Sequence, residues 1–185
     1  MNYNPLENEK CLYDIEDIYK IKIHKYEDDD YEFVSVEKTK DLDRKEAYRN
    51  GYNYLLKSIT DKIEWFIEAG LEDYQGDIYY LGVDEEGRYY FLPQGYGSCS
   101  GCDAYDGAEY DCQHDRNLVS LDRLRDSMKR HIIQFENLEE FKEYLCGEYT
   151  KGSFYYYSLD MKDFIEKLNR EFGWNLKWKE WELEI

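Results

Sequence analysis

Four residues in one glycine-rich segment have the types and the spacing of a metal site. Cys99 and Cys102 form a C-x-x-C pair inside "GYGSCSGCD", and Cys112 and His114 follow as a C-x-H pair. The small residues between the first two cysteines allow both thiolates to turn towards one cation, and three thiolates with one imidazole complete a closed tetrahedral zinc shell. The segment therefore predicts a structural zinc site with Cys99, Cys102, Cys112 and His114 as ligands.

The residues leave other roles for this segment open. Reduced cysteines pack as small hydrophobic groups, and the C-x-H gap is shorter than the usual spacing between zinc ligands. A redox C-x-x-C pair is disfavoured, because such motifs begin a helix after a strand and "CSGCDAYDG" is too rich in turn-forming residues to open one. The weakest alternative is calcium, since the order of the four candidate carboxylates does not match an EF-hand loop. Those carboxylates are Asp103, Asp106, Glu109 and Asp111.

The same segment is also long for a connection. Residues 94–117 show little hydrophobic periodicity, which predicts a cysteine- and glycine-rich loop. Loops of this length inside a compact domain are uncommon and tend to be functional or tied down by something other than a core. A shared zinc ion would supply that tie.

Two hairpins and a long helix are expected before this segment. "YKIKIHKY" and "YEFVSVEK" alternate apolar and polar residues on either side of the acidic run at 27–30. "DIYYLGV" and "RYYFL" flank the turn "DEEG", and Pro93 is expected to stop the second of these strands. Between the hairpins, apolar residues at steps of three and four from Tyr48 to Ile67 predict one long helix that ends at Gly70.

Shorter elements are expected after it. A helix passes through Leu121 and Met128, "HIIQF" is a strand, and Asn137 with Glu140 forms a capping signature for the next helix. "SFYYYS" and the tail "WNLKWKEWELEI" are predicted strands, on either side of a helix that Ser158 begins and Gly173 ends. Strand pairs mixed with amphipathic helices predict an α+β fold, a single domain over residues 1–185 with an antiparallel sheet of hairpins, one long helix and two or three shorter helices.

The charge of the chain limits its partners. The chain has 42 Asp and Glu against 24 Lys and Arg, for a formal net charge of −18. Such a surface repels phosphate and anionic lipid, so direct binding to nucleic acid or to a membrane is disfavoured, whereas basic proteins are attracted. No run of residues is apolar enough for a membrane span and the polar start lacks a signal-peptide pattern, which predicts a cytoplasmic protein.

The acidic run between the strands of the first hairpin is the clearest candidate for contact with such a partner. Four consecutive acids in a turn are costly to place anywhere but on the surface. The predicted partner-binding residues are Glu27, Asp28, Asp29, Asp30 and Glu32.

The middle third of the chain carries a resemblance. The stretch from the second hairpin through "YGSCSGCDAYDG", followed by "NLEEFKEYL", resembles a scattered group of small uncharacterised phage and bacterial proteins with a Gly-Ser-Cys-Ser-Gly-Cys-Asp core. The resemblance implies an origin in phages or mobile elements and transfers no established activity.

The chain contains no P-loop, G-x-G-x-x-G, G-x-S-x-G or H-E-x-x-H motif, so the sequence gives no positive sign of catalysis. With the charge and the resemblance, this favours a non-enzymatic phage or mobile-element protein. We expect it to bind and inhibit a basic, nucleic-acid-binding host protein such as a defence nuclease, partly by nucleic-acid mimicry, as anti-CRISPR proteins do. The alternatives are a small enzyme or nucleotide-sensing module built on the cysteine segment, and a structural phage protein.

Overall fold

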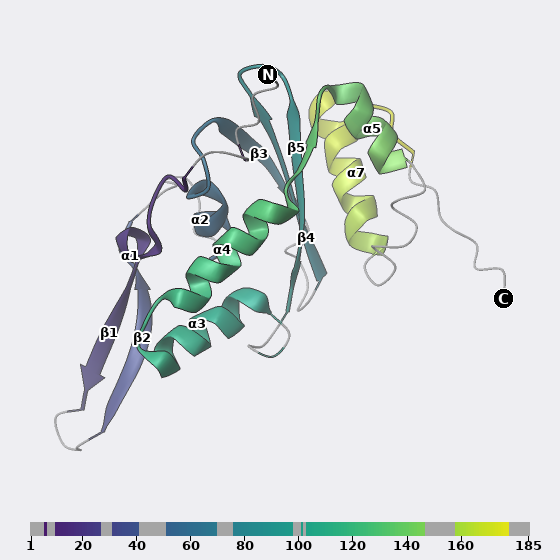
Figure 1. Ribbon diagram of the computed structural model, residues 1–185. Coiled ribbons are helices and arrows are strands. Elements are labelled where there is room, and N and C mark those ends of the chain that lie inside the picture. Colours follow the sequence, from purple (N-terminus) through teal and green to yellow (C-terminus); the bar gives the residue numbers. More distant parts are fainter. Residues whose placement is uncertain are drawn as a thin grey trace. The chain divides into compact units, whose positions relative to one another are not determined.

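The computed structural model describes residues 6, 10–26, 31–40, 51–69, 76–97, 101, 103–146 and 158–177. Its contacts divide the chain into two compact units, Met1–Lys62 with Gly97–His131, and Ile63–Tyr96 with Ile132–Ile185. Both units contain helices and antiparallel strands, so the predicted α+β class is confirmed (Figure 1). Each unit is described by itself.

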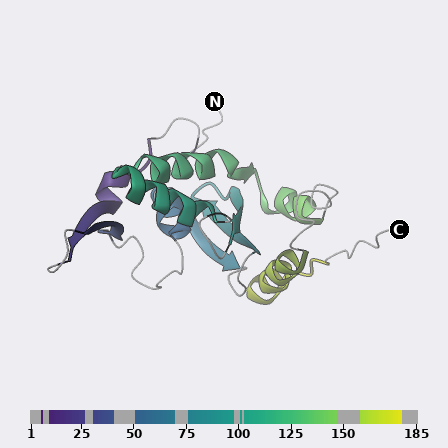
Figure 2. The same cartoon turned by 90° about the horizontal axis from the view of Figure 1, so that it is seen from below.

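The first unit is a two-stranded ribbon with four helices. Strand β1 (Tyr19–Lys25) pairs antiparallel with β2 (Glu32–Lys38), which confirms the first predicted hairpin. The ribbon projects from the helices of its unit in both views (Figures 1 and 2). The helices are α1 (Ile15–Ile18), α2 (Tyr52–Lys57), α3 (Ala104–Asp115) and α4 (Val119–His131). Helix α3 packs on α4 and also contacts β2.

The core of the first unit is built around tyrosines. Tyr19, Tyr52 and Tyr105 are buried. The centroid of the Tyr105 ring lies 6.4 Å from that of Tyr19 and 5.8 Å from that of Tyr52. Gly51, just before α2, is required by this packing, because a Cβ at that position would overlap the ring of Tyr105.

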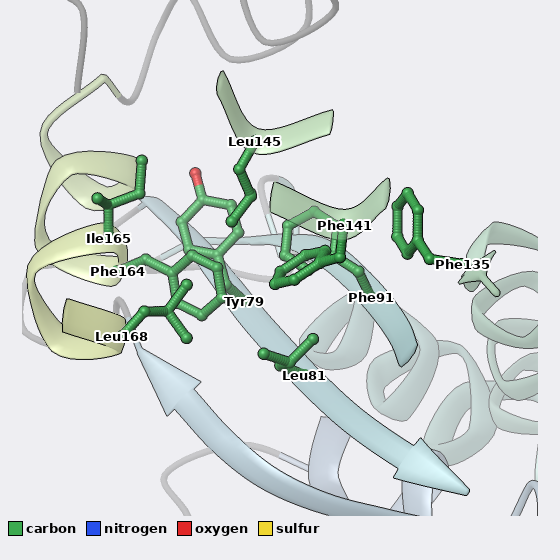
Figure 3. Packing of buried hydrophobic residues seen from close by; sticks show 9 residues of the cluster. All are labelled: Tyr79, Leu81, Phe91, Phe135, Phe141, Leu145, Phe164, Ile165 and Leu168. Carbon is green, nitrogen blue, oxygen red and sulfur yellow. The ribbon is translucent and has the colours of Figure 1, made fainter. Parts of the chain in front are cut away.

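The second unit is a four-stranded antiparallel sheet with helices packed on it. The strands are β3 (Ile63–Ala69), β4 (Gly76–Asp84), β5 (Tyr89–Tyr96) and β6 (Ile133–Phe135), in this spatial order. Helices α5 (Leu138–Cys146) and α7 (Ser158–Phe172) supply apolar side chains that meet those of β4 and β5 (Figure 3). This cluster comprises Tyr79, Leu81, Phe91, Phe135, Phe141, Leu145, Phe164, Ile165 and Leu168.

Two predicted helix ends of the second unit are confirmed, the start of α5 at Asn137 and the end of α7 at Gly173. The side-chain oxygen of Asn137 accepts the Glu140 amide at 3.0 Å, and the Glu140 carboxylate accepts the Glu136 amide at 2.9 Å. The first bond satisfies an amide that the first turn of α5 leaves without an intrahelical partner, and the second ties the residue before the cap to that turn. Gly173 follows α7 with a φ of 66°, the left-handed conformation that favours glycine at a helix end.

The predicted long helix is wrong in its second half. Helix α2 ends at Lys57, and Ile63–Ala69 is strand β3, paired with β4. The sequence "IEWFIEA" fits the helical spacing of three and four and also the period of two of a strand, because Ile63, Trp65 and Ile67 are every second residue. β-Branched and aromatic residues suit a pleated strand, and pairing with β4 decides between the two. Among the described helices, α7 is the longest, with 15 residues.

Pro93 does not stop the second hairpin. Strand β5 continues through it to Tyr96, with Pro93 opposite Tyr79 of β4. Proline lacks the amide hydrogen, so it is tolerated where the strand needs no donor on that side. Among the described residues, β5 pairs on its other side with β6 only from Tyr89 to Phe91, so no described strand needs a donor from Pro93 there.

The remaining strand predictions concern the C-terminal part of the chain. "SFYYYS" at 153–158 lies outside the described residues except for Ser158, the first residue of α7. In the tail, residues 173–177 have no regular secondary structure, so this part of the predicted terminal strand is wrong. Residues 178–185 lie outside the described part of the chain.

Candidate partner-binding surface and cysteine segment

Of the predicted partner-binding residues, the structure describes only Glu32, the first residue of β2. Glu27, Asp28, Asp29 and Asp30 are outside the described residues, and Glu32 opens β2 with its side chain exposed. The Lys25 ammonium lies 2.8 Å from the Glu32 carboxylate, and its hydrogen bond and charge lower the pKa of Glu32 below the ordinary value. Glu32 is therefore ionised at neutral pH, with Lys25 as its counter-ion.

Exposed aromatic residues flank the acidic run on both strands. Tyr26 follows β1 and is 57% exposed, while Tyr31 precedes β2 and is 64% exposed. Phe33, one register step further from the turn, is 39% exposed. Large exposed aromatic groups beside a charged turn are typical of contact surfaces for proteins.

The aspartate of the "GSCSGCD" motif has a structural role that the sequence did not reveal. Asp103 is 4% exposed, and one carboxylate oxygen accepts the amides of Tyr105 at 2.8 Å and Asp106 at 3.0 Å. The Tyr52 hydroxyl donates to the same oxygen at 2.9 Å, and the Gly97 amide donates to the other at 2.9 Å. Asp103 therefore begins α3 and joins the two ends of the segment that carries Cys99 and Cys102.

The predicted loop at 94–117 is mostly not a loop. Strand β5 extends to Tyr96 and helix α3 covers Ala104–Asp115, so the expectation that "CSGCDAYDG" cannot open a helix is wrong. The cap at Asp103 and the burial of Tyr105 and Cys112 outweigh the weak helix propensity of the glycine and aspartates. The C-x-x-C pair thus lies between a strand and a helix start, which removes the objection raised against a redox pair.

The described zinc candidates lie on one helix and face different ways. Cys112 is fully buried, while the His114 side chain is 76% exposed beside the Asp115 carboxylate at 3.0 Å. Residues two apart on an α-helix point about 200° apart, so these two side chains are not brought together. Cys99 and Cys102 lie outside the described residues, so the zinc site stays a prediction.

The surroundings of Cys112 are those of a packed thiol. Burial raises the pKa of the thiol, and the Leu121 and Ser120 amides facing the sulfur offset part of that rise. Nor do the four carboxylates proposed for calcium converge: among the described residues, no group of three or more histidines, cysteines or acids could hold a metal ion.

A shallow groove of about 570 Å³ lies between α3 and α4 beside the motif. Small residues of α3 form one wall, and the first turns of α4 form the other. Its polar side chains include Asp111 and Arg123, both exposed. Of the two carboxylates that line the groove, Asp103 caps α3 and Asp111 is exposed.

Comparison with known proteins gives no relative: no protein-family model, no curated protein and no solved structure matches the chain. Within the described residues, no helix is long and apolar enough to cross a membrane.

Sequence reasoning missed the aromatic residues around the acidic turn as a group. The period of two in "KIKIHKY" and "YEFVSV" could have indicated that His24 and Tyr26 share one face of the first strand and Tyr31 and Phe33 one face of the second. Only the pairing register shows that these two faces are the same.

Proposed function

We propose that this chain is a non-enzymatic phage or mobile-element protein that binds and inhibits a basic, nucleic-acid-binding host protein, such as a defence nuclease. The observation that carries the proposal is the open end of the β1–β2 ribbon, where exposed tyrosines flank four consecutive acids. A projecting ribbon with this charge fits a basic groove built for the phosphates of DNA or RNA.

Charge balance along the ribbon supports this use of the turn. Residues 25–32 contain one lysine against five acids. Lys25 is paired with Glu32, so the lysine nearest to the turn already has a counter-ion. The turn therefore keeps a negative field that a basic partner neutralises, and the same field keeps nucleic acid away.

The experiment measures association with purified bacterial defence nucleases and inhibition of their DNA cleavage. Association should slow as salt rises, because screening shortens the reach of the charges to about 10 Å at 0.1 M ionic strength. Duplex DNA should compete for the same surface of the nuclease. Replacing Asp28, Asp29 and Asp30 with asparagine should lower the association rate about tenfold or more.

A matched control removes equal charge elsewhere. Glu85, Glu166 and Glu171 are exposed acids of the second unit, and their replacement by glutamine changes the net charge by the same amount. If the control slows association as much as the turn variant, the turn is not the contact and only the overall charge matters. Absence of both binding and inhibition across the nuclease panel would contradict the proposal itself.

A further inference from the structure

We draw no further inference here: the strongest candidate, the surface patch of exposed rings on one face of the β1–β2 ribbon (Tyr26, Tyr31 and Phe33), carries none, because the described ion pairs beside it leave no charge that would select a ligand and nothing in the structure shows what covers it.

Discussion

The β1–β2 and β4–β5 hairpins use aromatic strands and acidic residues near their turns in different ways. In the β4–β5 hairpin, the turn acid Asp84 is consumed locally: its carboxylate accepts the Arg88 Nε–H at 2.8 Å and the Tyr90 hydroxyl at 2.8 Å. Residues 19–38 of the first hairpin contain no arginine. An acid followed four residues later by arginine therefore closes its own turn, whereas the described acid of the first hairpin, Glu32, pairs with Lys25 across the ribbon and with Arg116 outside it.

The aromatic rings of the β4–β5 hairpin are buried, whereas those at the end of the β1–β2 hairpin are exposed. Tyr79 and Phe91 are fully buried under α5 and α7, where their centroids lie 6.0 Å apart with planes at 5°. Tyr26 and Tyr31 contact each other with more than half of their surface exposed. Aromatic strand residues thus form a core where helices cover them and stay exposed at the end of the first hairpin.

The largest expected effect separates the two hairpins by stability. Phe91→Ala should lower the free energy of unfolding by about 3 to 5 kcal/mol, because it removes a buried ring and leaves a cavity. Phe33→Ala should cost less than about 1 kcal/mol, because that ring is already partly in water. Urea unfolding followed by circular dichroism measures both changes. A similar loss in the free energy of unfolding for the two variants would show that Phe33 supports the fold as much as Phe91 does.

A smaller loss is expected when the closed turn is opened. Asp84→Asn removes the carboxylate that lies 2.7 Å from Arg88 Nη2, a guanidinium whose side chain is only 7% exposed. Uncompensated buried charge is costly, so the free energy of unfolding at pH 7 should fall by about 3 kcal/mol. Glu85→Gln, in the same turn but exposed, is the control and should change it by less than about 0.5 kcal/mol.

The pH dependence of the free energy of unfolding is a second test of the role of Asp84 in this turn. Burial alone would raise the pKa of Asp84, but hydrogen bonds from Tyr90 and Arg88 outweigh it and lower the pKa. A carboxyl with a lowered folded pKa stabilises the fold above its unfolded pKa, about 4, and this contribution is lost as the pH falls through the folded pKa. The stability difference between parent and Asp84→Asn should therefore shrink below pH 4. A constant difference down to pH 2 would contradict the assignment.

These contrasts also explain what the sequence could predict. Both hairpins were predictable, because a period of two bounded by turn residues is a local signal, and the cap of α5 was predictable from Asn137 and Glu140. Strand β3 was not, because Ile63, Trp65 and Ile67 fit a helix as well as a strand. The start of α3 was not either, since its cap depends on Tyr52 and Gly97, which lie elsewhere in the sequence. The common face of His24, Tyr26, Tyr31 and Phe33 could not be predicted either, because it depends on the pairing register of β1 and β2.

The smallest expected effect concerns the zinc prediction. If Cys99, Cys102, Cys112 and His114 share one zinc, purified protein contains stoichiometric metal and His114→Ala lowers both the metal content and the stability of the segment. In the helix seen here, His114 is exposed and bonded only to its neighbour Asp115 among the described residues, so His114→Ala should change stability by less than about 0.5 kcal/mol. Elemental analysis and thermal unfolding of both proteins measure this, with His131→Ala, another exposed histidine at a helix end, as the control. A zinc-dependent loss specific to His114→Ala would require the last turn of α3 to unwind, because Cys112 and His114 cannot face one ion while both remain helical.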